Sequence, residues 1–456
     1  MTSHSRIGAQ QIVDKVRQAL TNAHTDAPHP AAAREASPAD QLPRSPFADL
    51  PEQEVLKLHR AVGVLTGISD PFHRLHDGRA SDTTTIGGRS VVNFSSYDYL
   101  GLNGHPGVAA AAKAAIDRFG TSVSASRLSG GERQVHRDLD EALARLHSCE
   151  SALAFVSGHA TNVSVIGTLL GAEDLIVCDS FVHNSIMEGA RLSGARRILS
   201  PHGDLDALER ALRLNRARHR RALVVVEGLY SMDGDMPDLA TLIKLKRRYD
   251  AWLMVDEAHS IGVLGANGRG IAEEQNIDPA DVDIWMGTLS KTLAAAGGYI
   301  AGAEPLVRLL KLTTPGFLFS VGLSPPVAAA AHAAIGLMQE ETWRLARMRE
   351  NGRLFLAGAR ARGLDTGFSI GAAITPVIVG NSPHAVLLSE RLLARGYNVG
   401  PAIFPGVAEN QARLRFFVTS QHTPKQIEDV LEATAEELQA VRSGPSFVSM
   451  VAGRQL

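Results

Sequence analysis

The sequence predicts an α/β fold, with a large domain on a mostly parallel central sheet and a smaller C-terminal α+β domain. Two observations carry this prediction. Short, fully apolar runs of strand length recur from about residue 90 onward, and amphipathic helical patterns separate them. Strands that are apolar throughout must be covered on both faces, as in parallel sheets flanked by helices. The predicted strands are SVVNF, ALAFV, DLIVCD, ALVVVEG, WLMVDEA, DIWMGTL and GYIAG.

Helical patterns alternate with these strands. They are predicted at residues 136–147, 204–215 and 238–250, and a longer helical region is predicted over 325–365. Beyond it, AAITPVIVG, GYNVGP and ARLRFFVTS predict the strands of a smaller unit. The expected division is an N-terminal helix and linker over 1–50, an N-terminal segment of the small domain over 51–90, the large domain over 91–340, the C-terminal small domain over 341–442 and a tail over 443–456.

The first fifty residues differ from the rest in composition and in their pattern of apolar residues. Residues 8–22 predict a short amphipathic helix, with Ile12, Val13, Val16 and Leu20 on one face. The stretch after it is rich in Pro, Ala and Asp, which is typical of a linker. Two interpretations stay open: an arm that docks a partner, such as a carrier protein, or a tail without a role. The start of the chain lacks the apolar core of a secretory signal.

Composition excludes several classes of function. The chain has 456 residues and a formal net charge of −2, so it shows no footprint of nucleic-acid binding. Its two cysteines, Cys149 and Cys178, argue against a disulfide framework and favour a cytoplasmic location. The least polar run, residues 321–338, holds two prolines and many alanines, which predicts a buried helix and not a membrane span. The histidines are scattered without ligand spacing, so no metal site is expected.

Polar residues follow the ends of the predicted parallel strands, which is the edge where ligands bind in such sheets. One strand ends before Ser157, and Gly158 and His159 then open a helix whose free amides suit a phosphate. Another ends at Glu227, with Ser231 close behind. Strand–glycine–helix turns are common, so each of these signals is weak when it stands alone.

Asp256 and Lys291 add residues that can do chemistry. Asp256 ends the strand WLMVD, and His259 follows three residues later. An acid at the mouth of a buried sheet needs a cationic or protonated partner, although a helix cap or a structural ion pair would also explain it. Lys291 is the one lysine in GTLSKTLAAAGGYIAG. It is either a surface lysine at a helix start or a desolvated amine that acts as a nucleophile.

Taken together, these residue types suit pyridoxal 5′-phosphate. A lysine forms a Schiff base with the aldehyde of this cofactor, and a carboxylate keeps its pyridinium nitrogen protonated, so that the ring becomes an electron sink. A glycine–helix turn takes its phosphate. We therefore expect Lys291, Asp256 and the turn at Gly158 to meet in one site.

Five longer motifs carry a resemblance to a known family. They are NFSSYDYLGL, GTSVSASRLSGGERQVHRDLD, EGLYSMDGD, VDEAHSIGVLGANGRG and GTLSKTLAAAGGYIAG. With these motifs in this order, the chain resembles the α-oxoamine synthases, fold-type I pyridoxal phosphate enzymes that include 8-amino-7-oxononanoate synthase and serine palmitoyltransferase. The resemblance runs over roughly residues 50–440. It implies a fold-type I pyridoxal-phosphate-dependent transferase.

The resemblance implies roles around the cofactor. Lys291 is expected to form the Schiff base, Asp256 to pair with the pyridinium nitrogen, and His259 to hydrogen-bond the phenolic oxygen. His136, in QVHRDL, is expected to stack on the ring face and to assist at the substrate. The phosphate or phenol side is expected to be lined by Ser231, Thr288 and the backbone of Gly158 and His159.

The resemblance also implies a homodimer and a carboxylate site. Ser320, in FLFSVGLSPP, resembles a residue that reaches phosphate from the neighbouring subunit. Arg415, in ARLRF, matches the arginine that grips the amino-acid carboxylate as a bidentate fork. Arg413 is the neighbouring candidate, and strand alternation is expected to let only one of the two face the site.

The implied reaction is the decarboxylative condensation of a small amino acid with an acyl thioester, carried on coenzyme A or on an acyl carrier protein, to an α-amino ketone. Tyr97, in SSYDYLGL, is expected at the substrate. It stands where several relatives carry asparagine, and its surroundings favour serine over alanine or glycine. Gly406 stands where some relatives carry threonine, which leaves the substrate contacts of that loop open.

Two alternatives belong to other classes of function. The first is another pyridoxal phosphate enzyme of the same fold, such as an aminotransferase. The second is a non-catalytic partner subunit. The presence of Lys291, Asp256 and His259 argues against a subunit that has lost its chemistry.

Overall fold

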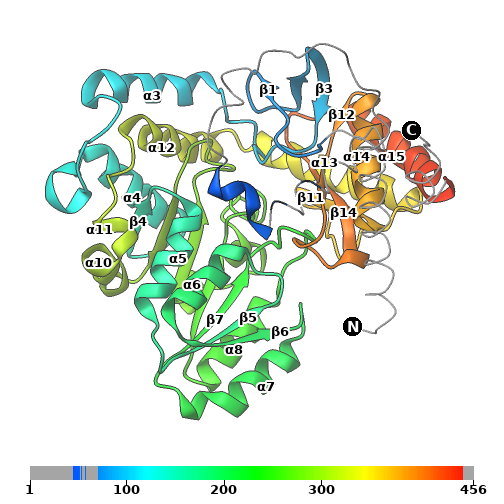
Figure 1. Ribbon diagram of the computed structural model, residues 1–456. Helices are drawn as coiled ribbons and strands as arrows, with labels where there is room; N and C mark the ends of the chain where they lie inside the picture. The colour runs from blue at the N-terminus through cyan, green and yellow to red at the C-terminus, as the bar shows by residue number, and fades with distance from the viewer. Residues whose placement is uncertain (1–44, 52, 54–56, 58–69, 445–456) are drawn as a thin grey trace.

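The computed structural model describes residues 45–51, 53, 57 and 70–444. Strands and helices alternate over most of this length, and Figure 1 shows them around one large twisted sheet. The helix predicted over residues 8–22, and most of the linker after it, lie outside the described residues.

The central sheet has seven strands in the order β4-β10-β9-β8-β7-β5-β6. Strand β10 runs antiparallel to both of its neighbours, and the other pairs are parallel. The predicted α/β class with a mostly parallel central sheet is therefore confirmed. The strands are β4 (Ser151–Phe155), β5 (Leu175–Asp179), β6 (Arg196–Ser200), β7 (Ala222–Glu227), β8 (Trp252–Asp256), β9 (Ile284–Thr288) and β10 (Gly298–Gly302).

Side chains of the inner strands alternate between two apolar layers, one on each face of the sheet. In β7, Val224 and Val226 join one layer, while Leu223 and Val225 join the other. The first layer is covered by α4 (Gln134–Leu146), α7 (Leu205–Asn215), α8 (Leu239–Arg248) and α12 (Pro325–Glu340). The second is covered by α5 (Gly158–Leu169), α6 (Asn184–Ser193) and α10 (Glu304–Thr313).

The remaining helices of this part are α3 (Pro106–Phe119), which packs along α12, and the short α9 (Ile271–Glu274) and α11 (Pro315–Leu318). Single turns occur at η2 (Pro46–Asp49), η3 (Arg127–Gly131), η4 (Arg216–Arg218), η5 (Pro279–Asp281) and η6 (Glu409–Gln411).

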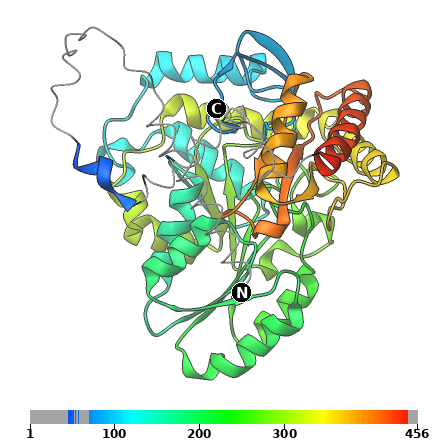
Figure 2. The same cartoon turned by 45° about the vertical axis from the view of Figure 1, so that its right-hand side comes forward.

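A smaller unit follows the large sheet along the chain. Its antiparallel sheet has the order β11-β14-β13, with β11 (Ile374–Gly380), β13 (Gly400–Ala402) and β14 (Ala412–Phe417). The helices α13 (Trp343–Ala361), α14 (Ser382–Ala394) and α15 (Pro424–Ser443) pack on this sheet through Phe355, Leu388 and Val430. Figures 1 and 2 both show these helices together at one side of the molecule.

A third sheet joins distant parts of the chain. It has the order β1-β2-β3-β12, with β1 (His76–Asp77), β2 (Thr83–Ile86), β3 (Arg89–Asn93) and β12 (Tyr397–Asn398). Strand β3 pairs in parallel with β12, so a segment before the large sheet lies beside a segment that follows it. The predicted division at residue 90 falls inside β3.

The structure differs from the predicted elements in a few places. Strand β6 was not predicted, because RRILS is polar and lies at an edge of the sheet with most of its residues exposed. The stretch GYNVGP forms two short strands, β12 and β13, in different sheets. The helical region over 325–365 is two helices, α12 and α13, with a break at residues 341–342.

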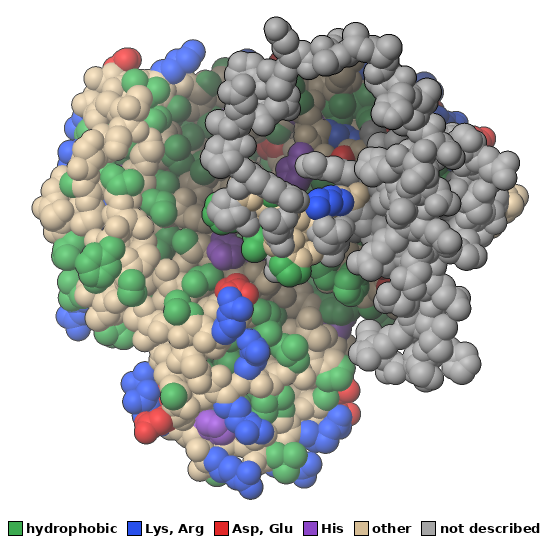
Figure 3. Space-filling view, in the orientation of Figure 1, with side chains coloured by type: hydrophobic (Ala, Val, Ile, Leu, Met, Phe, Trp, Pro, Cys, Tyr) green, Lys and Arg blue, Asp and Glu red, His purple; other side chains and the backbone are tan. Residues whose placement is uncertain are grey.

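The surface carries mixed charges. Figure 3 shows Lys and Arg side chains gathered at the end of the molecule that holds α7 and α8. Arg216, directly after α7, pairs with Asp250 at 2.8 Å, and Arg248, at the end of α8, pairs with Glu209 at 2.6 Å. The run predicted as a buried helix contributes α12, whose Ala328 is fully buried. No helix within the described ranges has both the length and the apolarity needed to cross a membrane.

Candidate active site

A cavity of about 340 Å³, the first cavity, opens at the carboxyl ends of the central strands. It lies where β7, β8 and β9 end and where α5 and α6 begin. The structure therefore brings together side chains that are far apart in the sequence. Six of the predicted site residues line it: Gly158, His159, Asp256, His259, Thr288 and Lys291.

Asp256 is the last residue of β8, and its carboxylate is held from two sides. Its Oδ2 accepts a hydrogen bond from Asn162 Nδ2 at 2.9 Å, and its Oδ1 accepts one from the backbone N–H of Ala258 at 3.0 Å. Asn162 lies one turn inside α5 and is buried. An acid held in this way presents a fixed negative charge to the cavity.

The same amide of Asn162 extends the contact to a histidine. Asn162 Nδ2 also donates to Ser185 Oγ at 3.0 Å, and Ser185 Oγ lies 2.7 Å from His183 Nδ1. His183 caps the start of α6 and lines the first cavity. None of these three residues was predicted as a site residue from the sequence. His183 follows the end of β5 by four residues, so a reading of every strand end would have included it.

Glu227 places a second carboxyl beside Asp256. The two residues are register partners at the ends of β7 and β8, and both are buried. Burial, and next the charge of Asp256, raise the pKa of Glu227 above its ordinary value. Its Oε2 accepts the backbone N–H of Ser231 at 3.1 Å. Two adjacent buried carboxyls do not both ionise readily, and the raised pKa of about 8 means that Glu227 keeps its proton near pH 7.

Lys291 stands three residues after β9 and lines the first cavity. Burial lowers the pKa of its amine to about 8, while Asp256 and Glu227 oppose this shift and Arg415 adds to it. An amine with this pKa has a much larger neutral, nucleophilic fraction near pH 7 than an ordinary lysine. This is the electronic state that Schiff-base chemistry requires.

His259 and Tyr97 border the amine of Lys291. The Nζ of Lys291 lies 5.9 Å from the ring centroid of Tyr97. The Tyr97 ring meets the His259 ring edge-on, with centroids 6.0 Å apart. Burial, followed by the positive charges of Lys291 and Arg415, lowers the pKa of His259 well below its ordinary value. His259 is therefore a neutral imidazole in the wall of the first cavity.

The start of α5 forms the opposite wall. Ser157 caps the helix by accepting the N–H of Ala160, and the helix then continues for 12 residues. A Cβ on Gly158 would meet Thr288 Oγ1 at 3.0 Å, so little side-chain volume fits here. Thr288 Oγ1 in turn donates to the carbonyl of Gly297 at 2.9 Å. The amides at this helix start are thus open to an anion.

These residues fit pyridoxal phosphate. An acid, an amine and a set of helix amides face one cavity, which are the three groups that this cofactor needs. In addition, Asn162 Oδ1 and Glu227 Oε1 are buried and have no hydrogen-bond partner among the described residues. Buried polar atoms in native proteins have partners, so these two oxygens indicate that a ligand or water completes the site.

Two arginines of β14 approach the loop after β7. Arg415 Nη1 donates to the carbonyl of Ser231 at 3.0 Å. Arg413 forms a buried ion pair with Asp233 at 2.8 Å. The expectation that alternation lets only one of them face the site is wrong, because residues two apart on a strand share a face. The two arginines differ in their partners. Arg413 is paired with Asp233, whereas Arg415 is close enough to lower the pKa of Lys291 and His259.

The structure does not bring every predicted residue into the first cavity. Ser231 lies beside it, where its backbone N–H contacts Glu227 and its carbonyl contacts Arg415. Ser320 lies between α11 and α12, near Arg127 and Phe155, and does not line the first cavity. Any contact of Ser320 with a phosphate therefore has to come from another copy of the chain.

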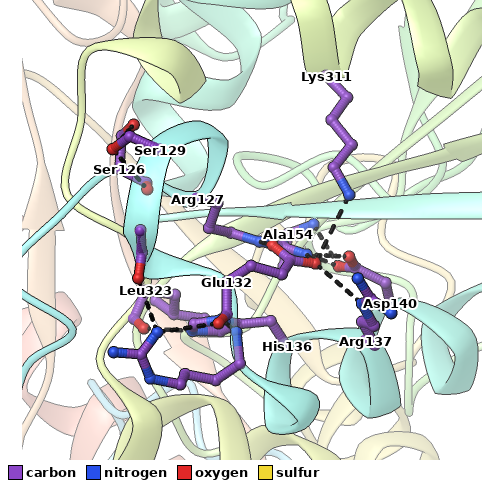
Figure 4. A network of polar contacts seen from close by, with 12 residues as sticks. Ser126, Arg127, Ser129, Glu132, His136, Arg137, Asp140, Ala154, Lys311 and Leu323 are labelled. Atoms are coloured by element: carbon purple, nitrogen blue, oxygen red, sulfur yellow. Dashed lines mark hydrogen bonds and ion pairs between the residues drawn. The ribbon is translucent and has the colours of Figure 1, made fainter.

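His136 is elsewhere, which corrects the prediction that it stacks on the cofactor ring. It lies in the first turn of α4, beside the ion pairs of Arg127 with Glu132 and Asp140 (Figure 4). Its Nε2 is 2.7 Å from the carbonyl of Leu323, and its Nδ1 accepts the N–H of Arg133 at 3.1 Å. Both ring nitrogens are thus bound to backbone. His183 is the histidine that lines the first cavity in its place.

A second cavity, of about 490 Å³, adjoins the first. Residues 76–103 form most of its wall, and most of the lining residues have polar side chains. The lining residues there include Arg79, Asn93, Ser95, Tyr97 and Asn103. Ser290 and Lys291 line both cavities. Lys291 therefore borders both cavities.

Known proteins resemble this chain over most of its length. The family model described as aminotransferase class I and II matches residues 89–433. A putative 8-amino-7-oxononanoate synthase of Desulforudis audaxviator is 40% identical over 85% of this chain and 98% of its own length. The 8-amino-7-oxononanoate synthase of Geobacter sulfurreducens is 41% identical over 76% of this chain and 89% of its own.

Solved structures agree with these sequence relatives. A variant of serine palmitoyltransferase from S. paucimobilis, with bound PLP–myriocin aldimine, superposes with a TM-score of 0.82 at 29% identity. It covers 86% of this chain and 99% of its own. Serine palmitoyltransferase of Sphingomonas wittichii gives a TM-score of 0.82 at 31% identity, over 87% of this chain and 100% of its own.

Proposed function

Because this chain belongs to the α-oxoamine synthase family of fold-type I pyridoxal phosphate enzymes, we propose that it condenses a small amino acid with an acyl thioester. It is an acyltransferase, and its cofactor is pyridoxal 5′-phosphate. In the proposed reaction, the bond from Cα to the carboxylate and the bond from the acyl carbon to sulfur break, and a bond from Cα to the acyl carbon forms. The products are an α-amino ketone, carbon dioxide and the free thiol, which balance the two substrates.

The observation that carries this proposal is the position of Lys291 between two cavities. The first cavity has groups suited to pyridoxal phosphate, and the second is larger and lined mostly by residues with polar side chains. An amino acid bound at the first cavity would expose its Cα near Lys291, and an acyl thioester can arrive through the second. Two substrates thus meet at one amine, which suits a condensation.

Pyridoxal phosphate, when bound, supplies an electron sink for the charge that develops at Cα. Lys291 would take the proton from Cα, because the lowered pKa of its amine increases the neutral fraction that can act as a base. Asp256, kept in place by Asn162, would accept a hydrogen bond from the ring nitrogen. His183, fixed through Ser185, forms a flat wall against which a ring can stack.

Arg415 and His259 act on the substrates in this scheme. Arg415 presents its guanidinium next to the loop at Ser231 and binds the amino-acid carboxylate before that group is lost. Neutral His259 hydrogen-bonds an oxygen of the cofactor or polarises the acyl carbonyl. Both residues stand beside Lys291, where the new bond forms.

The identity of the amino acid is the finer part of the proposal. Tyr97 beside Lys291 and the likeness to serine palmitoyltransferases support serine. The relatives that are 40–41% identical are named 8-amino-7-oxononanoate synthases. Alanine and glycine are therefore tested as substrates beside serine.

The test is a visible spectrum of the purified holoenzyme during titration with serine, alanine and glycine in turn, with and without an acyl thioester. We expect one amino acid to shift the cofactor band at low concentration. Adding thioester should then release carbon dioxide from carboxyl-labelled amino acid in equal amount to free thiol. Release of thiol without carbon dioxide would overturn the decarboxylative scheme.

The same assay compares acyl donors. Acyl-coenzyme A and the same acyl group on an acyl carrier protein should be offered separately to the full-length chain. A large preference for the carrier protein would support docking through the N-terminal arm, most of which lies outside the described residues.

We also propose a homodimer, in which Ser320 of one copy reaches the phosphate of the other. A monomer that is fully active at all concentrations would contradict this arrangement.

An aminotransferase is the second candidate, since the matching family model carries that name. Such an enzyme exchanges amine with a keto acid and needs no thioester. Holoenzyme incubated with amino acid and a keto acid, without thioester, distinguishes the two. Rapid amine exchange and no acyl transfer would favour the aminotransferase.

A further inference from the structure

Tyr99 makes a buried contact with His259 that the proposed chemistry has not used. Its hydroxyl oxygen lies 2.7 Å from His259 Nδ1, and both side chains are buried. Tyr99 does not line the first cavity, whereas His259 does. Any effect of Tyr99 on the reaction therefore passes through the imidazole.

The direction of this hydrogen bond follows from what the hydroxyl can reach. Within the described part of the chain, His259 Nδ1 is the one side-chain partner recorded for the Tyr99 hydroxyl. If Nδ1 carried the hydrogen, the Tyr99 O–H would be left buried without an acceptor, which is costly. Burial also raises the pKa of Tyr99 well above its ordinary value, so the hydroxyl keeps its proton. Tyr99 is thus the donor and Nδ1 the acceptor.

The protonation of the His259 imidazole follows from its surroundings and from this hydrogen bond. His259 is neutral, because burial and the positive charges of Lys291 and Arg415 disfavour a second proton and lower the pKa of the imidazole. A neutral imidazole has one N–H, and the other nitrogen is an acceptor. Since Nδ1 accepts from Tyr99, the hydrogen of His259 sits on Nε2.

We propose that Tyr99 is a positioning residue that fixes His259 as the Nε2–H tautomer, so that this imidazole is always a hydrogen-bond donor toward the first cavity. The anionic oxygen that receives this hydrogen bond is the phenolic oxygen of the cofactor, and this last clause rests on the proposed function. The tautomer itself does not.

The backbone around Tyr99 makes it suited to this role. The carbonyl of Tyr99 accepts the N–H of Ser420 at 2.8 Å, and its N–H donates to the carbonyl of Tyr97 at 2.8 Å. The ring of Tyr97 packs edge-on against His259 from another side. The imidazole is therefore held in both position and tautomer by one short segment, residues 97–99.

Neutron diffraction from crystals of the deuterium-exchanged, full-length holoenzyme tests the tautomer directly. We expect deuterium on the Tyr99 oxygen and on His259 Nε2, and none on His259 Nδ1. Deuterium on Nδ1 would overturn the proposal. Since the map reports proton positions without turnover, the result holds even if the enzyme proves to transfer a different group.

The variant Tyr99→Phe tests whether the tautomer of His259 affects the bound cofactor and the rate of turnover. It removes the donor and frees His259 to adopt the other tautomer, so the bound cofactor should change. We expect the pH midpoint of its visible band to shift by about one unit, and kcat to fall about 3- to 10-fold with little change in the KM of the amino acid. An unchanged spectral midpoint in a folded Tyr99→Phe protein would contradict the proposal.

The chain offers a matched control. Tyr299, also fully buried, forms a similar pair with His147, with its hydroxyl 2.9 Å from His147 Nε2. Neither residue lines the first cavity. Tyr299→Phe therefore makes the same chemical change in the core, and we expect it to leave the spectral midpoint and kcat unchanged. Equal shifts in both variants would mean that Tyr99 acts through general packing, which would overturn the positioning role.

Discussion

At the scale of single residues, the state of Lys291 determines how the enzyme acquires its cofactor. Burial lowers the pKa of this amine to about 8, and only the neutral amine attacks an aldehyde. The rate of Schiff-base formation by apoenzyme should therefore rise about tenfold per pH unit below pH 8 and level off above it. Stopped-flow absorbance after adding pyridoxal phosphate, from pH 6 to pH 10, measures this.

A lysine in small peptides is the control for this experiment, because its rate should keep rising to about pH 10.4. If the apoenzyme follows the same curve as the peptide, Lys291 is not desolvated in solution. Lys291→Ala should form no Schiff-base band at any pH.

Arg415 and Arg413 share a face of β14, yet substitutions in them should have different effects. Arg415→Lys removes the planar fork that grips a carboxylate, so the KM of the amino acid should rise about 10- to 100-fold. Arg413→Gln leaves the buried Asp233 without its partner and should lower the unfolding free energy by about 3–5 kcal/mol. Steady-state kinetics and thermal unfolding of both variants separate the effects. A larger rise in KM for Arg413→Gln than for Arg415→Lys would reverse the assignment.

At the scale of elements, the start of α5 has to approach the end of β9 closely. A Cβ on Gly158 would lie 3.0 Å from Thr288 Oγ1. Gly158→Val should therefore weaken the binding of pyridoxal phosphate at least about tenfold, because a side chain fills the space in front of the helix amides. Equilibrium dialysis of the cofactor measures this affinity.

Gly336 in α12 is the control, since a Cβ there would meet nothing within 4 Å. Gly336→Ala should stabilise the protein by about 0.5–1 kcal/mol and leave the cofactor affinity unchanged. Unchanged affinity in Gly158→Val as well would show that the start of α5 does not bind the phosphate.

The elements themselves were predictable where local pattern decides them. Strands such as β7 are apolar along their whole length, because helices cover both faces, and this is visible in the sequence. Strand β6 carries no such signal, since an edge strand leaves its residues exposed. The residues at strand ends were predictable for the same reason, and Asp256, His259 and Lys291 do line one cavity. His136 was misplaced because a motif alone does not show which face of α4 a side chain occupies.

At the scale of the whole molecule, the pairing of strands that are distant in the chain could not be predicted from the sequence. Strand β3 pairs with β12, about 300 residues later, and no local pattern specifies such a partner. The ion pair of Arg413 with Asp233 likewise joins the small unit to the loop after β7 across the fold. Contacts of this kind depend on how the units pack together, so they became visible only in the structure.

The cofactor should stabilise the whole molecule, because its cavity joins the ends of β7, β8 and β9 to the starts of α5 and α6. At a free concentration of 100 times Kd, pyridoxal phosphate should add about 2.7 kcal/mol to the unfolding free energy. Differential scanning calorimetry at increasing cofactor concentration measures this gain. Lys291→Ala should show a smaller gain, and a Tm independent of cofactor would contradict the site.

The proposed binding of the amino acid in the first cavity and the acyl thioester in the second has a consequence for protein engineering. The two cavities share Ser290 and Lys291, while the rest of the second cavity comes mainly from residues 76–103. Under the proposed function, substitutions at Arg79, Ser95 and Asn103, which line the second cavity and not the first, should alter which acyl donor is accepted while the lining of the first cavity stays unchanged. A randomised library confined to these three positions would therefore explore new products while Lys291 and the residues around it stay intact.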